Sequence, residues 1–223
     1  MLKDIEAVIF DLDGTLVDSM GLWDDIDVAF LKKHNHQVPD DLEEIIAGMS
    51  FTEVAIYFKK RFDISTPAEE IKKEWVEMAR YKYIHEAMLK PGARKLLEYL
   101  KDHNIKLGIA SSNSRELVDD VLKARDIGGF FDEVHTSCEV ASGKPSPDIY
   151  LLTAKHLAVS PSKCLVFEDI PMGITAGKDA GMKTCAVADE FSAHQEMQKR
   201  ELADYYIDSF EQVLAETYEV CDG

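Results

Sequence analysis

The apolar positions of this chain follow two different patterns. Between residues 18 and 88 they recur at about the spacing of a helix, as at Leu22, Ile26 and Phe30, with no good strand. After Pro91 the pattern changes, and short apolar runs alternate with amphipathic segments. Alternation of this kind predicts a parallel sheet that is covered by helices on both faces.

A short apolar run at residues 7–10 predicts one further strand ahead of the helical region. Two sequences that begin with Ser50 and Thr66 have the spacing of a capping box, and the second would place Pro67 at the first helical position. We expect strands at 7–10, 105–110, 133–136, 164–167, 183–187 and 205–207, and helices at 18–36, 50–62, 93–102, 114–124, 171–180 and from residues 66, 146 and 209.

The predicted fold is an α/β protein, a doubly wound parallel sheet with an inserted all-helical cap domain. Residues 1–16 and 90–223 would form the sheet and its covering helices, and residues 17–89 would form the cap. Sheets of this class bind ligands at the carboxyl ends of their strands, so the functional site is expected at that edge.

Composition narrows the class of partner. The formal net charge of −17 would repel nucleic acids and anionic membranes, so a small molecule is the expected ligand. The chain has no apolar run long enough to span a bilayer, and its first residues lack the features of a signal peptide. The four cysteines are widely spaced and match no metal or redox motif. We therefore expect them to be structural thiols in a reducing compartment. We expect a cytoplasmic monomer or small homo-oligomer with no nucleic-acid or membrane partner.

Polar side chains follow the predicted strands at the edge where ligands bind. Acidic groups follow the first strand and a later one, hydroxyl and amide groups follow the second, and a lysine lies in a Gly-Lys-Pro loop. Random placement would not select the same edge each time. These residues are Asp11, Asp13, Ser111, Ser112, Asn113, Lys144, Glu168 and Asp169.

Each of these signals has a simpler interpretation when it is taken alone. Asp11 and Asp13 are also consistent with an ordinary turn that ends a strand. Ser111 is consistent with a helix cap, and Lys144 with a solvated loop lysine. The argument for a site therefore depends on all of the groups lying at one edge.

Converging carboxylates require a positive partner. At about 4 Å and an effective dielectric constant near 20, each pair of like charges costs roughly 4 kcal/mol. A set of oxygen ligands favours a hard cation, with Mg²⁺ first among the candidates. If Asp13 is protonated, Mg²⁺ and Lys144 together balance the three remaining acids, which allows a phosphate group to approach.

The order of these motifs is similar to that of the haloacid dehalogenase superfamily of phosphotransferases. The resemblance covers nearly the whole chain, and the helical segment after the first motif resembles the small cap of the phosphoglycolate-phosphatase and β-phosphoglucomutase branch. The motifs that carry it are Asp11-Leu-Asp-Gly-Thr15, Ser111, Lys144 before Pro145, and Glu168-Asp169.

The resemblance implies covalent catalysis. Asp11 would attack phosphorus and carry an aspartyl-phosphate. Asp13 would protonate the leaving oxygen and then activate water. Ser111 would donate a hydrogen bond to the transferring phosphoryl group, and Lys144 would balance its charge.

The same resemblance implies a set of Mg²⁺ ligands. They are the Asp11 carboxylate, the backbone carbonyl of Asp13 and the Asp169 carboxylate. Glu168 would bind the metal directly or through water.

The leading hypothesis is a Mg²⁺-dependent phosphatase of a small phosphorylated metabolite, and the alternative is a sugar-phosphate mutase. Mutases of this family have a histidine and an arginine in the cap, and here Trp23 and Phe51 occupy those positions. Arg80 or Lys82 would have to supply the missing charge. Trp23 and Phe51, together with Ser112 and Asn113, are the expected substrate contacts.

Two further functions fit the sequence less well. The first is carbon–halogen cleavage, because the dehalogenase members of the superfamily lack the second aspartate, which Asp13 supplies here. The second is phosphate acceptance without catalysis. A non-catalytic phospho-acceptor module needs no cap. Within the cap, Trp75, Met78 and Tyr81 are expected to form its apolar core.

Overall fold

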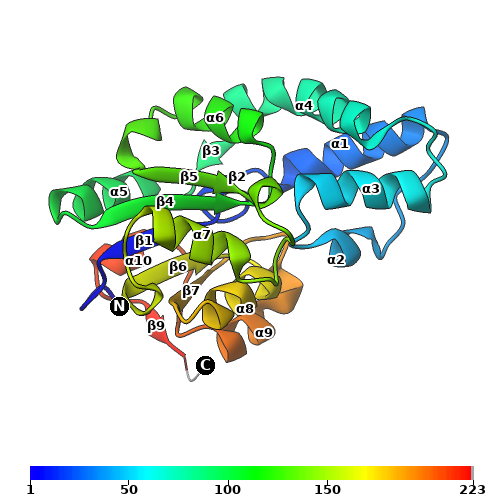
Figure 1. Cartoon of the computed structure of the whole chain (residues 1–223). Coiled ribbons are helices and arrows are strands. Elements are labelled where there is room, and N and C mark those ends of the chain that lie inside the picture. The colour runs from blue at the N-terminus through cyan, green and yellow to red at the C-terminus, as the bar shows by residue number, and fades with distance from the viewer. Residues whose placement is uncertain (222–223) are drawn as a thin grey trace.

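The computed structural model describes residues 1–221, and its main element is a sheet in the order β5-β4-β1-β6-β7-β8-β9. All neighbouring strands are parallel except β8 and β9, which are antiparallel. Figure 1 shows the sheet with helices on both faces. The strands are β1 (Ala7–Phe10), β4 (Lys106–Ser111), β5 (Glu133–Thr136), β6 (Cys164–Glu168), β7 (Lys183–Val187), β8 (Tyr205–Ile207) and β9 (Glu219–Val220).

β1 lies inside the sheet, and all four of its side chains are buried. Its last residue, Phe10, is in register with Ile109 of β4 and Phe167 of β6. The rings of Phe10 and Phe167 stack with centroids 5.2 Å apart. Because the three strands run parallel and in register, the residues that follow them emerge at the same edge.

Alternate side chains of β1 bury against different helices, as the twofold repeat of a strand requires. Val8 and Phe10 face a core that includes α5 (Ala93–Asp102) and α6 (Arg115–Ala124). Ala7 and Ile9 face the core formed with α7 (Asp148–His156) and α8 (Pro171–Asp179). The remaining helices of this part are α9 (Glu196–Leu202) and α10 (Glu211–Leu214). No helix among residues 1–221 combines the length and apolar character that a membrane span needs.

The cap helices gather at one end of the sheet (Figure 1). An aromatic cluster fills their interior, in which the Trp75 ring lies 5.3 Å from Phe30 and 5.0 Å from Phe58. Two short antiparallel strands join the cap to the sheet domain. The cap elements are β2 (Val17–Asp18), α1 (Met20–Lys33), α2 (Leu42–Ile46), α3 (Phe51–Arg61), α4 (Ala68–His85) and β3 (Met88–Leu89).

The predicted α/β fold with an inserted helical cap is confirmed, and several element predictions need correction. The expectation of no strand between residues 18 and 88 was wrong at its ends, because β2 and β3 pair there. Two residues per strand give no periodicity to read. The elements α2, α9 and β9 were not predicted. The domain boundaries at residues 16 and 89 stay a prediction.

The capping signals differed in their outcome. Ser50 and Glu53 form a complete capping box at the start of α3. At α4, Pro67 precedes the helix instead of opening it, and no side chain caps that terminus. Tyr81 was wrongly expected in the cap core: it is exposed, whereas Trp75 is buried.

Candidate active site

Asp11 lies at the carboxyl end of β1 and is buried against a lysine. Its backbone N–H donates to the Phe167 carbonyl at 3.0 Å, which extends the pairing of β1 with β6 by one residue. Lys144 Nζ lies 2.6 Å from Asp11 Oδ1 and 2.5 Å from Glu168 Oε1. Burial lowers the pKa of Lys144, but the two carboxylates outweigh burial and raise it. Lys144 therefore remains a cation within the protein interior.

Glu168 is enclosed by hydrogen-bond donors. Its Oε1 accepts from Lys144 and from the Tyr150 hydroxyl at 2.8 Å. Its Oε2 accepts from the backbone N–H groups of Asp169 at 3.0 Å and Ile170 at 3.3 Å. A side chain at Gly173, in the first turn of α8, would collide with this carboxylate. The packing thus fixes both oxygens of Glu168.

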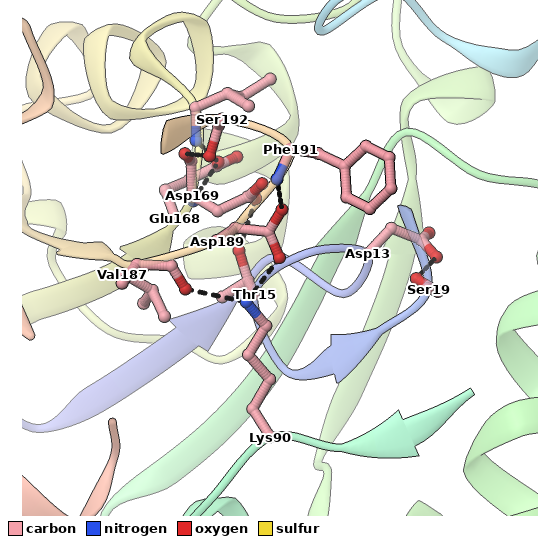
Figure 2. Close-up of polar contacts among 12 residues, drawn as sticks. Asp13, Thr15, Ser19, Lys90, Glu168, Asp169, Val187, Asp189, Phe191 and Ser192 are labelled. Atoms are coloured by element: carbon pink, nitrogen blue, oxygen red, sulfur yellow. Dashed lines mark hydrogen bonds and ion pairs between the residues drawn. The ribbon is translucent and has the colours of Figure 1, made fainter. Parts of the chain in front are cut away.

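Asp169 is the next acidic group at this edge, and Figure 2 shows its surroundings. Thr15 donates its hydroxyl to Asp169 Oδ1 at 2.8 Å. Burial, and then the charges of Glu168 and Asp189, raise the pKa of Asp169 to about 7. Behind it, Lys90 pairs with Asp189 at 2.6 Å. Without a bound cation, the Asp169 carboxyl would keep its proton at pH values well above those at which an aspartate usually ionises.

Gly14 explains why this turn has room for Asp169. Its φ is +77°, a backbone conformation that other residues rarely adopt. A Cβ atom at this position would also collide with Asp169 Oδ2. The glycine of the Asp-Leu-Asp-Gly motif therefore permits both the turn and the approach of the second acidic segment.

The acidic groups fit a hard divalent cation. Asp11, Glu168 and Asp169 are all buried, and each offers an oxygen within 4.8 Å of the others. Burial is the main cause that raises the pKa of Asp11 well above its usual value, and Glu168 and Asp169 add to the effect against the opposing Lys144. A bound cation would remove this cost. Oxygen-only donors match Mg²⁺.

Asp13 lies in a separate group of hydrogen bonds at the boundary with the cap. Ser19, just before α1, donates to Asp13 Oδ1 at 2.6 Å. Asn113 Nδ2 donates to Asp13 Oδ2 at 2.9 Å. The Tyr83 hydroxyl, from α4, also donates to Asp13 Oδ1. Three donors from three parts of the chain therefore orient this carboxylate.

Tyr83 was not predicted as a site residue. It is fully buried, and burial together with Asp13 raises its pKa well above the usual value, so its hydroxyl stays protonated. The hydroxyl oxygen accepts from Trp23 Nε1 at 2.5 Å and from Asn113 Nδ2 at 2.7 Å. Trp75, Ala79 and Tyr83 recur at the spacing of one helix face, so the sequence pattern marks Tyr83 only as core.

The segment after β4 supplies two different kinds of contact. Ser111 is buried, and its hydroxyl oxygen accepts from the Asn113 N–H at 3.0 Å. Ser114, not Ser111, caps α6 by accepting from the Leu117 N–H at 3.3 Å. The capping alternative for Ser111 is thus removed, and its hydroxyl hydrogen is available to a ligand.

Ser112 contacts the cap instead of the acidic groups. Its carbonyl accepts from the Phe51 N–H at 2.9 Å, and its hydroxyl donates to the Gly48 carbonyl at 3.3 Å. Phe51 packs edge-on against Trp23 with centroids 5.8 Å apart. These three residues therefore line the junction between cap and sheet, and only Trp23 among them is bonded to the group around Asp13.

The two cap cations considered for a mutase are paired elsewhere. Arg80 Nε lies 2.9 Å from Asp120 Oδ2, and Lys82 Nζ lies 2.5 Å from Asp25 Oδ2. Neither of these ion pairs includes an active-site acid. The described cap thus offers no free cation at the positions where the mutase reading requires one.

Comparison with known proteins finds both related sequences and related structures for this chain. The model of the haloacid dehalogenase-like hydrolases matches residues 5–181. A phosphorylated carbohydrates phosphatase of Thermotoga maritima is 32% identical over 179 residues, which are 80% of this chain and 83% of that protein. Among solved structures, CbbY of Rhodobacter sphaeroides in complex with phosphate has a TM-score of 0.83 at 26% identity, covering 94% of this chain and 96% of the other. A β-phosphoglucomutase of Clostridium difficile has a TM-score of 0.77 at 27% identity, covering 96% of both chains.

Proposed function

Because the chain belongs to the haloacid dehalogenase-like hydrolases, we propose that it is a phosphatase that hydrolyses small phosphorylated metabolites with Mg²⁺ through an aspartyl-phosphate on Asp11. The observation that carries the proposal is the pairing of Asp11 with Lys144 inside a buried acidic group. A carboxylate held in this way has one oxygen bonded to the lysine and the other left for attack. A phosphorylated carbohydrate is the substrate class to test first, as in the Thermotoga relative.

The first chemical step would be attack of Asp11 on phosphorus. Lys144 bonds to Oδ1, so Oδ2 is the proposed nucleophile. The new Asp11–phosphorus bond forms as the bond to the leaving oxygen breaks. Protonated Asp13 gives its proton to that oxygen, so the alcohol departs neutral.

The second step would release phosphate. Asp13, now ionised, takes a proton from a water molecule that attacks the phosphoryl group, and the bond to Asp11 breaks. Splitting the reaction in this way replaces one difficult displacement with two easier ones. The hydrogen bonds from Ser19, Asn113 and Tyr83 would orient Asp13 for both proton transfers.

The metal would be held by the Asp11 and Asp169 carboxylates and the backbone carbonyl of Asp13. When bound, it would supply positive charge to the phosphoryl oxygens. Glu168 has both oxygens in hydrogen bonds to the protein, which supports contact with the metal through water and a main role in holding Lys144. Ser111 would donate its hydroxyl to a phosphoryl oxygen.

A mutase is the second candidate, because β-phosphoglucomutases are among the structures with the same fold. Mutases must retain a bisphosphorylated intermediate, which calls for a cation in the cap. Trp23 and Phe51 carry no charge, and Arg80 and Lys82 are ion-paired with other residues. These features favour hydrolysis.

The experiment is a panel of phosphorylated metabolites assayed for inorganic phosphate with Mg²⁺ and with a chelator. We expect phosphate release that requires the metal and is lost in Asp11→Asn. Hexose 1-phosphate converted to its isomer without phosphate release would favour the mutase. Release that persists in the chelator would contradict the metal-dependent mechanism. A long-lived phospho-protein without turnover would favour the phospho-acceptor reading.

The setting of the reaction is part of the same proposal. We place the enzyme in the cytoplasm, where small phosphorylated metabolites occur and cysteines stay reduced. Cys138, Cys164 and Cys185 form no disulfide, which supports this location.

A further inference from the structure

A second group of possible metal ligands lies at the edge strand of the sheet. Glu133 and His135 are on β5, two residues apart, so their side chains leave the same face of the strand. His156 is the last residue of α7, which packs beside β5 (Figure 1). Each of the three side chains offers an oxygen or nitrogen atom within 4.8 Å of the other two. None of the catalytic residues belongs to this group.

The His135 ring has a nitrogen that the protein leaves without a hydrogen bond. The side chain is 9% exposed, and its Nε2 has no hydrogen-bond partner among the described residues. The other nitrogen, Nδ1, lies 2.9 Å from Glu139 Oε2. In the neutral ring this contact places the hydrogen on Nδ1, so the lone pair of Nε2 points to the group. A carboxylate behind a histidine in this way is the usual support of a metal-binding imidazole.

The spacing of the donor atoms suits a small tetrahedral ion. Zn²⁺ binds nitrogen and oxygen ligands at about 2.0–2.2 Å, which puts neighbouring ligand atoms roughly 3.3–3.6 Å apart. Glu133 Oε2 lies 3.3 Å from His135 Nε2 and 3.9 Å from His156 Nδ1. The His135 and His156 ligand atoms lie within 4.8 Å of each other, so a movement of the half-exposed His156 side chain would complete the arrangement.

We propose that Glu133, His135 and His156 bind Zn²⁺ or a similar divalent transition metal, with Glu139 as the residue that positions His135. Two imidazoles and one carboxylate suit Zn²⁺ better than Mg²⁺, which prefers oxygen ligands. Water would fill the fourth position. The metal would join the end of α7 to β5, and the segment between these two elements carries Lys144. Binding would thus stabilise the protein by holding the carboxyl end of α7 against the beginning of β5.

The test is calorimetric titration of the whole chain with Zn²⁺, in excess Mg²⁺ so that the catalytic acids are occupied. We expect one Zn²⁺ per chain. His156→Gln should weaken its binding by at least 100-fold, because a ligand is lost. His156 is half exposed, so this variant should fold normally. His194→Gln is the matched control, since His194 is an exposed histidine elsewhere, and its binding should equal that of the wild type.

Glu139→Gln separates a positioning role from a structural one. It should weaken Zn²⁺ binding by about 10–100-fold while leaving the stoichiometry at one, as loss of a supporting carboxylate does in other sites. Co²⁺ should give the visible absorption of a tetrahedral complex in the wild type and not in His156→Gln. Zn²⁺ should also raise the melting temperature of the wild type and of His194→Gln, and should do so much less for His156→Gln.

Three results would overturn the proposal. The first is no Zn²⁺ binding at pH 7.5. The second is equal affinity in His156→Gln and the wild type. The third is a Zn²⁺ site that survives His156→Gln but disappears in Asp169→Asn, because the ion would then be in the catalytic site.

Discussion

The two aspartates proposed for catalysis stand two residues apart, yet different regions of the molecule hold them. Asp11 is fixed by the sheet domain, through Lys144. Asp13 takes hydrogen bonds from Tyr83 of the cap and from Ser19 at the start of the cap, in addition to Asn113 of the sheet domain. None of the hydrogen bonds described for Asp11 comes from the cap, although Gly143, beside Lys144, donates its N–H to Glu53 of the cap at 3.2 Å. A change at Tyr83 or Ser19 should therefore affect proton transfer more than attack.

The largest loss of activity is expected from a change at Asp11, the aspartate that the sheet domain holds. Asp11→Asn removes the nucleophile, so phosphate release should fall at least about 10³-fold for every substrate. The measurement is initial rate with an aryl phosphate and with an alkyl phosphate. A circular-dichroism spectrum equal to that of the wild type is the control for folding. Turnover close to the wild-type rate would remove Asp11 from its proposed role.

Asp13→Asn should slow the reaction by an amount that depends on the leaving group of the substrate. An alkyl phosphate, whose leaving oxygen needs a proton, should lose about 10²–10⁴-fold in rate. An aryl phosphate with an acidic phenol should lose much less in the first step, which a burst of phenol would reveal. Equal losses of that burst for both substrates would contradict the assignment of Asp13 as the acid.

The three buried acids of the sheet domain, Asp11, Glu168 and Asp169, should make metal binding depend on pH. In the metal-free protein the pKa of Asp169 is raised to about 7 by burial and by Glu168 and Asp189. Below that pH, Mg²⁺ must displace a proton, so its apparent affinity should fall by about tenfold per pH unit. Titration of activity with Mg²⁺ at pH 8, 7 and 6 measures this slope. Equal affinity at pH 8 and pH 6 would show that Asp169 is already ionised without metal.

The stability of the metal-free protein should fall as pH rises, whereas its affinity for Mg²⁺ should increase. A buried acid whose folded pKa is raised binds its proton more tightly than in the unfolded chain, so its contribution declines as pH rises from about 4 to about 7. Mg²⁺ should therefore raise the melting temperature more at pH 8 than at pH 6. The same scan with Asp169→Asn should show little dependence of this Mg²⁺ effect on pH.

Two tyrosines give a matched test of the comparison itself. Tyr83 donates to Asp13 from the cap, and Tyr150 donates to Glu168 from α7. A hydrogen bond to a charged group contributes about 1.5–3 kcal/mol, so each Tyr→Phe change should slow turnover roughly 10–150-fold. For Tyr83→Phe the loss should be larger with the alkyl phosphate. For Tyr150→Phe the loss of rate should be the same with both substrates. A larger loss with the alkyl phosphate in Tyr150→Phe would contradict the proposed separation of the two roles.

The smallest effect concerns an acid in the cap that has no catalytic role. Burial, and then the charge of Asp24, raise the pKa of Asp27 to about 7. At pH 8 the folded protein must ionise it, which lowers stability, whereas at pH 5 the proton stays bound. Asp27→Asn should thus stabilise the protein by roughly 1–2 kcal/mol at pH 8, after allowance for partial solvation. Thermal melts at both pH values measure it, and a gain at pH 5 as large as at pH 8 would contradict the assigned pKa.

Local sequence predicted the parts of this protein whose physical cause is local. The apolar run before Asp11 makes a buried strand, and the acids after it must then emerge at the strand end. The same reasoning applies to Glu168 and Asp169 after β6, and to Ser111 after β4. Parallel strands in register bring such segments to one edge, so the acidic group was predictable without knowledge of the side-chain contacts.

The tertiary structure alone decided which groups surround each acid. Tyr83 has the spacing of a core residue on α4, and only the position of the cap brings its hydroxyl to Asp13. Thr15 is the last residue of the first motif, but its partner Asp169 is distant in sequence. The pair β2 and β3 is equally invisible in the pattern, because two residues cannot show a period. Contacts between distant segments depend on how whole elements pack, and no local pattern encodes that arrangement.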